Sequence, residues 1–342
     1  MDRFRSCVFQ VGKALLPRSG ILSGCALAVL AGSLLSCQRP DRYLIYPKAF
    51  PAHVQTWTDE VDKGPLRLRL VWAQPWGAGP WPTVLVHPDG AATAAEMRGV
   101  LWDLASRGYL AVAADYRRLH KGRYRRTLFP WCEAAEMTAI IEALHAQPGV
   151  DWQRLAALGF SQGGIFGLLL ATQAPEIKTV IAYYPVTDFP RWLAAPQAPL
   201  LKRFVFYFIR AYFRHDAKRC AGVPFQTVLA NASALYQSER IEFPVLLIHG
   251  DQDGAAPVEE SRRLAARLVA QGREVKLVVI AGGQHVFNFK HPAQAQEAWQ
   301  ATLHWLARHL AIPPPGSYKE SRQNSRRISV SAGPCSSPGE SR

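Results

Sequence analysis

A five-residue pattern, Gly-x-Ser-x-Gly, constrains the fold of this chain more than any other feature of its sequence. It runs from Gly159 to Gly163 with Ser161 at its centre. An apolar run, Leu155–Leu158, precedes it, and a helix-like run, Ile165–Ala171, follows it. A serine on a sharp turn between a strand and a helix exposes its hydroxyl, and small neighbours let the helix pass close to the strand. The pattern therefore predicts a strand, a tight turn and a helix, with Ser161 as a candidate nucleophile.

Two polar turns further along the chain carry the partners that a serine nucleophile needs. The apolar run Pro244–Ile248 leads into a turn that contains Asp253, and the run Val275–Ile280 leads into a glycine-rich turn that ends at His285. Open α/β sheets place their sites past the carboxyl ends of such strands. We predict a triad in which His285 is the general base for Ser161 and Asp253 orients the imidazole and stabilises its cation.

Two other aspartates are alternatives for the acid. Asp251 precedes Asp253 by two residues, and Asp188 follows an earlier strand-like run, Lys178–Tyr184. An aspartate that is not used in catalysis would serve as a loop cap or a turn former, which this residue type does readily. The residues alone leave the choice open.

Three stretches resemble the dienelactone hydrolase and prolyl oligopeptidase-like branch of the α/β-hydrolases. The stretch 249–257 resembles its acid loop, 148–164 its approach to the nucleophile, and 112–117 a strand that ends in an Asp-Tyr-Arg turn. The resemblance covers about residues 66–311. It implies an α/β-hydrolase fold, a catalytic acid at Asp253, and the chain order serine, aspartate, histidine that the predicted triad follows.

The loop after the third predicted strand departs from that branch. Relatives often carry His-Gly-Gly there, whereas this chain has His87, Pro88, Asp89 and Gly90. Proline has no N–H to donate. We therefore expect the oxyanion to be stabilised by the backbone N–H groups of Gln162 and Asp89. The Asp89 carboxylate must then point away from the oxyanion, because it would otherwise oppose the developing negative charge.

Strand-like and helix-like runs alternate along the chain, which predicts a mostly parallel central sheet with helices on both faces. The run Leu66–Trp72 alternates with period two, as a half-buried antiparallel strand does. Near-continuous apolar runs, typical of buried parallel strands, are Thr83–His87, Tyr109–Ala114, Leu155–Gly159, Lys178–Tyr184, Pro244–His249 and Val275–Ile280. Helical patterns cover Glu96–Arg107, Trp131–Gln147, Ile165–Gln173, Val258–Gln271 and Ala293–Leu310.

One connection is longer than a crossover needs. About fifty residues separate Asp188 from Phe243, whereas a crossover helix takes about a dozen. We predict a helical cap insertion at about 190–240, whose aromatic residues line an apolar acyl pocket. The alternative is that they pack only on the body of the domain. These aromatic residues are Phe204, Phe206, Phe208, Tyr212 and Phe213.

The two ends of the chain differ from its middle. Basic residues precede an uncharged run, Ile21–Leu35, which predicts a signal peptide over 1–36. The box before Cys37 resembles that of a bacterial lipoprotein, with Cys37 as the lipidated residue; plain secretion and an uncleaved anchor are the alternatives. We expect an N-terminal extension over 37–65, too short for a propeller domain, and a disordered tail over 312–342.

Composition limits the partners and cofactors. The net charge of +14 is concentrated partly in the run Arg117–Arg126, which we expect to be a solvated loop, with an anionic membrane surface as a second reading and no nucleic acid. The sequence has no metal-ligand spacing and no dinucleotide-binding glycine motif after a strand, so we expect neither a metal nor a cofactor. Cys132 and Cys220 form a disulfide or stay buried thiols.

Together these features predict a serine hydrolase that is carboxylesterase-like and acts on an ester, a thioester or a small amide through an acyl-enzyme. The expected location is the periplasm or the cell envelope, with a lipid anchor at Cys37. A prolyl oligopeptidase-like peptidase is one alternative. A catalytically silent hydrolase-fold protein that binds lipid or a partner is another.

Overall fold

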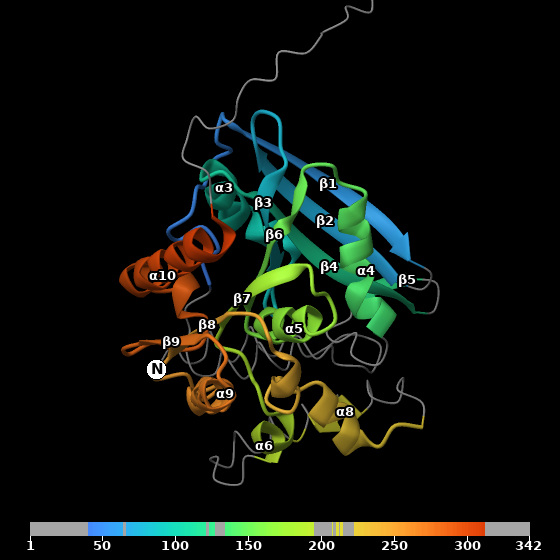
Figure 1. Cartoon of the computed structure of the whole chain (residues 1–342), viewed down its shortest axis with the longest axis vertical. Coiled ribbons are helices and arrows are strands. Elements are labelled where there is room, and N and C mark those ends of the chain that lie inside the picture. The colour runs from blue at the N-terminus through green and yellow to red at the C-terminus, as the bar shows by residue number, and fades with distance from the viewer. Residues whose placement is uncertain are drawn as a thin grey trace, which may run out of the picture. The chain divides into compact units, whose positions relative to one another are not determined.

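The computed structural model describes residues 40–63, 66–120, 123–126, 134–194, 207, 210, 211, 213, 214 and 222–311. These residues form a central sheet with helices packed against it (Figure 1). Several predictions lie outside the described residues: the signal peptide 1–36, Cys37, the tail 312–342, Cys132, Cys220, Phe204, Phe206, Phe208 and Tyr212. Within the described part of the chain, no helix is long and apolar enough to cross a membrane.

The sheet is mostly parallel. Its strands are β1 (Val54–Lys63), β2 (Leu66–Pro75), β3 (Trp81–His87), β4 (Leu110–His120), β5 (Arg123–Arg126), β6 (Val150–Phe160), β7 (Ile177–Tyr183), β8 (Val245–Gly250) and β9 (Val275–Ile280). They lie in the order β1-β2-β4-β3-β6-β7-β8-β9, and β5 pairs with β4. The pairs β1–β2, β2–β4 and β4–β5 are antiparallel, and all the others are parallel. Each strand-like run named in the sequence overlaps one strand of this sheet, whereas β1 and β5 had not been predicted.

Helices cover both faces of the sheet, as expected (Figure 1). One face is packed by α3 (Arg98–Ser106) and α10 (Pro292–Leu310), and the other by α4 (Ala134–His145), α5 (Gln162–Ala171) and α9 (Glu259–Ala270). The shorter elements are η1 (Ala94–Met97), α6 (Phe189–Ala194), α8 (Phe225–Asn231), η2 (Ser238–Arg240) and η3 (Phe287–Phe289). Parallel strands that are enclosed in this way are buried on both faces, and every residue of β3 and β8 is buried.

Two segments fold differently from the expectation. The segment 37–65, predicted as an extension ahead of the first core strand, contributes β1, which pairs along its whole length with β2. The described residues of the basic run Arg117–Arg126, predicted as a solvated loop, are the end of β4 and β5, which pair antiparallel, so the prediction of a loop was wrong for them. The reason lies in the sheet: β3 pairs with β4 only as far as Ala113, which leaves the edge of β4 beyond it open to β5.

The predicted cap insertion is described only in part. Its two described helices, α6 and α8, pack against each other. Phe213 is buried, with its ring 5.4 Å from that of Phe189 at the start of α6. This aromatic residue therefore packs on the body of the domain, and its role in an acyl pocket stays a prediction.

Candidate active site

Ser161 occupies a strained turn between β6 and α5. Its backbone φ of 52° lies in the left-handed region, which non-glycine residues rarely adopt. The Ser161 N–H donates to the Tyr183 carbonyl at 2.9 Å, which ties the turn to the end of β7. A Cβ on Gly159 would lie 2.1 Å from the Gly163 carbonyl oxygen, so the helix can pass this close to the strand only because residue 159 is glycine. The strand, turn and helix agree with the sequence prediction.

The three residues predicted as a triad lie together. Ser161 follows β6, Asp253 follows β8 and His285 follows β9, so all three are at the carboxyl edge of the sheet. The Ser161 Oγ is 3.0 Å from His285 Nε2, and His285 Nδ1 is 2.6 Å from Asp253 Oδ2. A carboxylate can only accept, so Nδ1 carries the proton and Nε2 is free to accept the serine hydroxyl proton. This arrangement matches a general base and its orienting acid.

The Asp253 carboxylate is held ionised and fixed. Burial by itself would raise its pKa, but His285 and His249 and the hydrogen bonds with them outweigh burial and hold the pKa well below its usual range. Its Oδ1 also accepts the N–H groups of Ala255 and Ala256, at 2.9 and 2.8 Å. Both oxygens therefore have partners, and the one that faces His285 cannot turn away without breaking backbone hydrogen bonds.

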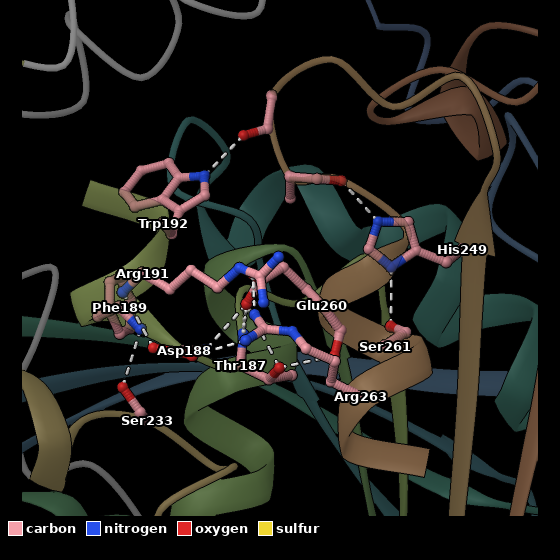
Figure 2. Close-up of polar contacts among 12 residues, drawn as sticks. Thr187, Asp188, Phe189, Arg191, Trp192, Ser233, His249, Glu260, Ser261 and Arg263 are labelled. Carbon is pink, nitrogen blue, oxygen red and sulfur yellow. Dashed lines mark hydrogen bonds and ion pairs between the residues drawn. The ribbon is translucent and has the colours of Figure 1, made fainter. Parts of the chain in front are cut away.

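The two alternative acids face other partners. Asp251 accepts the Gly282 N–H at 2.7 Å. Asp188 is paired with Arg263 at 2.7 Å, and Arg263 also pairs with Glu260 (Figure 2). Asp251 therefore fastens the turn ahead of His285, and Asp188 belongs to a cluster at the start of α9.

Further contacts beside that cluster hold the acid loop, 249–257, in place. His249, fully buried in β8, is 2.8 Å from the Ser261 hydroxyl through Nδ1 and donates from Nε2 to the Ala256 carbonyl at 2.7 Å (Figure 2). The Trp192 indole N–H, from α6, donates to the Ala255 carbonyl at 2.8 Å. The backbone carbonyls on either side of the Ala255–Ala256 bond are thus fixed by side chains from β8 and α6.

The loop after β3 lies against the nucleophile turn, as the oxyanion prediction requires. A Cβ on Gly163 would lie 2.1 Å from the His87 carbonyl oxygen, and one on Gly90 would lie 2.8 Å from the Gln162 Oε1. Gln162 is the first residue of α5, and the first turn of a helix favours negative charge. Gln162 therefore lies against the loop that carries Asp89.

Asp89 turns its carboxylate into the protein. Its Oδ1 accepts the N–H groups of Ala91 and Ala92, at 2.8 and 3.1 Å, and its Oδ2 is 2.5 Å from the Arg42 guanidinium. Burial would raise the pKa of this carboxyl, but Arg42, the Ala91 N–H and His285 bring it below its usual value. The carboxylate is therefore held by Arg42, a residue that the sequence did not single out, and its orientation relative to an oxyanion stays a prediction.

Two neighbours of the site carried no recognisable signal in the sequence. Arg42 is one of 40 lysine and arginine residues, 47 positions from its partner Asp89. Tyr184 has a φ of 40°, packs edge-on against the His285 ring at 4.8 Å, and donates its hydroxyl to Asn288 at 2.7 Å. It is the last residue of the run that predicted β7, but nothing in a strand pattern marks a tyrosine as a support for the imidazole.

The described residues contain no group of three or more His, Cys, Asp or Glu side chains placed to hold a metal ion.

Comparisons with known proteins agree with this fold. The prolyl oligopeptidase family matches residues 100–312, which is more than half of the chain. The uncharacterized peptidase YuxL of Bacillus subtilis is 25% identical over 177 residues, covering 51% of this chain and 25% of that protein. The acylaminoacyl peptidase of Pyrococcus horikoshii superposes with a TM-score of 0.61 at 18% identity, over 78% of this chain and 43% of the other.

The esterase Est2 of Thermogutta terrifontis, solved with butyrate bound, gives a TM-score of 0.57 at 20% identity and covers 78% of this chain and 97% of the esterase. At these identities the structural likenesses show the α/β-hydrolase fold alone. The chain thus spans a quarter of YuxL and less than half of the archaeal peptidase, but nearly the full length of the esterase.

Proposed function

The chain belongs to the prolyl oligopeptidase family, and we propose that within it the chain is a serine hydrolase that cleaves an ester, a thioester or a small amide through an acyl-enzyme. One observation carries the proposal: the continuous line from Ser161 Oγ to His285 Nε2 at 3.0 Å and from His285 Nδ1 to Asp253 Oδ2 at 2.6 Å. A serine hydroxyl is a weak nucleophile until a base takes its proton, and this arrangement supplies the base.

In the proposed reaction, Ser161 Oγ attacks the substrate carbonyl carbon while His285 Nε2 takes the hydroxyl proton. The carbonyl oxygen becomes an oxyanion, stabilised by the N–H groups of Gln162 and Asp89. Collapse of this intermediate breaks the bond to the alcohol, thiol or amine, which leaves with the proton from His285. Water then attacks the acyl-enzyme with His285 again as base, which releases the acid and restores Ser161.

We favour a carboxylesterase-like substrate over a peptide. The esterase Est2 matches this chain over 97% of its own length, so a protein of similar extent suffices for ester cleavage. The peptidase alternative is supported by the family itself and by the two peptidases that match, although this chain spans only a quarter of one and 43% of the other. If Phe206 and Phe208 line the predicted acyl pocket, they would favour substrates with longer acyl chains.

We also propose that the protein is exported and anchored by a lipid at Cys37. The proposal is supported by the basic and apolar segments that precede Cys37. The first described residue, Pro40, lies three positions after Cys37. An anchor at Cys37 would therefore hold the folded domain close to the membrane, where the surplus of basic residues favours anionic lipid.

The test uses the purified full-length chain, a fluorophosphonate probe, a series of p-nitrophenyl esters and a series of peptide arylamides. Ser161→Ala is the test variant and Asp251→Asn the matched control. We expect labelling and ester cleavage in the wild type and the control, both lost in Ser161→Ala, and arylamide cleavage that is weaker by about tenfold or more. A wild type that neither reacts with the probe nor cleaves either series would overturn the proposal; arylamide cleavage above ester cleavage would select the peptidase.

A further inference from the structure

We propose that Arg42 is a positioning residue of the active site: its positive charge cancels that of the Asp89 carboxylate, so that the loop after β3 can carry a buried acid beside the oxyanion. The inference rests on the proposed hydrolase function. It concerns a residue that lies outside the family match at 100–312 and reaches the site from the segment before β1.

The pair is buried, and this makes it a strong electrostatic feature. The side chains of Arg42 and Asp89 are only 9% and 5% exposed, and the nearest nitrogen and oxygen are 2.5 Å apart. Surface ion pairs contribute little because water screens them, but removing one member of a buried pair leaves a charge that is costly to keep. The Asp89 Oδ1 atom, held by the N–H groups of Ala91 and Ala92, fixes the carboxylate in this orientation.

Arg42 connects the two sides of the catalytic site. Its guanidinium lies 4.4 Å from the centre of the Phe289 ring, in the element that follows His285. The preceding residue, Asp41, donates its N–H to the Phe289 carbonyl at 2.6 Å, and Tyr46 packs on the same ring. The guanidinium therefore lies between the loop after β3, which carries Asp89, and the segment that follows His285.

The charge of Asp89 acts on His285. The loop that carries Asp89 packs against the nucleophile turn, and His285 Nε2 is 3.0 Å from Ser161 Oγ in that turn, so the two groups share one site. The positive charge of a protonated His285 lowers the pKa of the Asp89 carboxyl. Among the described residues, the other titratable groups around His285 are its partner Asp253 and, acting on that carboxylate, His249 and Lys290. The facing Tyr184 is neutral because burial raises its pKa well above its usual value.

Losing Arg42 leaves Asp89 unbalanced, which favours the protonated, inactive imidazole and opposes the oxyanion. Losing the Asp89 charge instead leaves Arg42 unbalanced, which favours the neutral imidazole. The two losses therefore act on the base in opposite directions, a signature that loss of packing would not produce.

The experiment measures kcat and KM for a p-nitrophenyl ester from pH 5 to 9 in Arg42→Met, Asp89→Asn and the double variant, with rates normalised to fluorophosphonate-reactive sites. Met keeps an apolar stem on the Phe289 ring, and Asn keeps the acceptor for Ala91 and Ala92. We expect the acid limb of kcat/KM to move up by about half a pH unit in Arg42→Met and down by a similar amount in Asp89→Asn. We also expect kcat to fall about tenfold or more in Arg42→Met with KM little changed, and the double variant to recover most of both effects.

The partly buried pair Arg154 and Asp151, 2.7 Å apart at the start of β6 and far from the carboxyl edge, supplies the control. Arg154→Met should lower stability without moving the acid limb. Single variants at Arg42 and Asp89 that shift the limb in the same direction or not at all, or a double variant whose losses add, would overturn the inference.

A substitute variant and a second measurement test the inference if Arg42→Met does not fold or cannot be assayed. If Arg42→Met does not fold, Arg42→Lys and the neutral double variant carry the comparison. Both keep the charge of the pair balanced, so both should keep the acid limb of the wild type while Asp89→Asn lowers it, and a shifted limb in either balanced variant would contradict the inference. The titration midpoint of the His285 imidazole, followed by NMR and assigned with His285→Gln, gives the same opposite shifts without turnover. A wild type that cleaves nothing thus refutes the proposed function, whereas unmoved midpoints refute the role of Arg42.

Discussion

Acid should destabilise the folded chain through His87, which ends β3 and lies against the nucleophile turn. Its side chain is 2% exposed, its ring packs on Phe166 at 4.7 Å and on Tyr116 at 6.3 Å, and its Nε2 has no hydrogen-bond partner among the described residues. Burial lowers the pKa of His87 to about 3. In the unfolded chain a histidine titrates near 6.5. Between these values the unfolded state binds a proton that the folded state excludes, so stability is full above about pH 6.5 and falls as the pH drops toward 3.

The size of the effect follows from linkage. Between pH 7.5 and pH 5.0 the exclusion of this proton should lower the free energy of unfolding by about 2 kcal/mol, and any folded pKa below about 4 gives nearly the same figure. Urea unfolding of the wild type and of His87→Phe at both pH values measures it, because all other titrating groups are shared. The variant should lose about 2 kcal/mol less than the wild type on acidification. His304→Phe, at an exposed position of α10, should lose as much as the wild type.

If His87→Phe packs poorly, His87→Gln serves, because the comparison uses the change with pH and not the absolute stability. Equal losses in the wild type and in both variants would refute the reasoning, since they would mean that His87 is protonated as easily in the folded state as in the unfolded one.

Other predictions address the acid, the turn and the anchor. Asp253→Asn should lower kcat by about three to four orders of magnitude, whereas Asp251→Asn, which weakens one bond from the Gly282 N–H, should stay within about tenfold in the same steady-state assay. Gly163→Ala should prevent correct folding or sharply lower the melting temperature in a thermal scan, because its Cβ would lie 2.1 Å from a backbone carbonyl oxygen; a variant with wild-type melting would contradict this. Cys37→Ser, or globomycin, should leave unprocessed and unlipidated protein, and mass spectrometry showing a mature N-terminus elsewhere would refute the anchor.

The parallel core of the fold could be predicted because its physics is local. A strand buried on both faces is apolar along most of its length, so runs such as Thr83–His87 and Pro244–His249 predict β3 and β8 directly. The strand β1 gave no such signal. In Val54–Lys63 the apolar side chains Val54, Trp57 and Val61 follow neither a period of two nor a continuous run. The strand lies at the edge of the sheet, where it pairs along its whole length with β2.

The candidate site, like the fold, could be predicted only in part. Ser161, Asp253 and His285 follow three strand-like runs, and parallel strands bring their carboxyl ends to one edge, so their meeting could be expected from the order of elements. The pairing of Arg42 with Asp89 could not be expected from the sequence. The sequence showed that a carboxylate beside the oxyanion needed to be turned away, but the residue that holds it comes from a segment without a core pattern. Contacts between distant loops depend on how the chain packs, and a single sequence carries no local trace of them.

The central claim is that Ser161 forms an acyl-enzyme, and trapping that intermediate tests it most directly. The wild type and Ser161→Ala are mixed with p-nitrophenyl butyrate, quenched in acid within the first turnover, and examined by intact-protein and peptide mass spectrometry. The wild type should gain the mass of one butyryl group on the peptide that contains Ser161, and Ser161→Ala should gain none and should not turn over. A butyryl group on another residue, or undiminished turnover by Ser161→Ala, would contradict the claim.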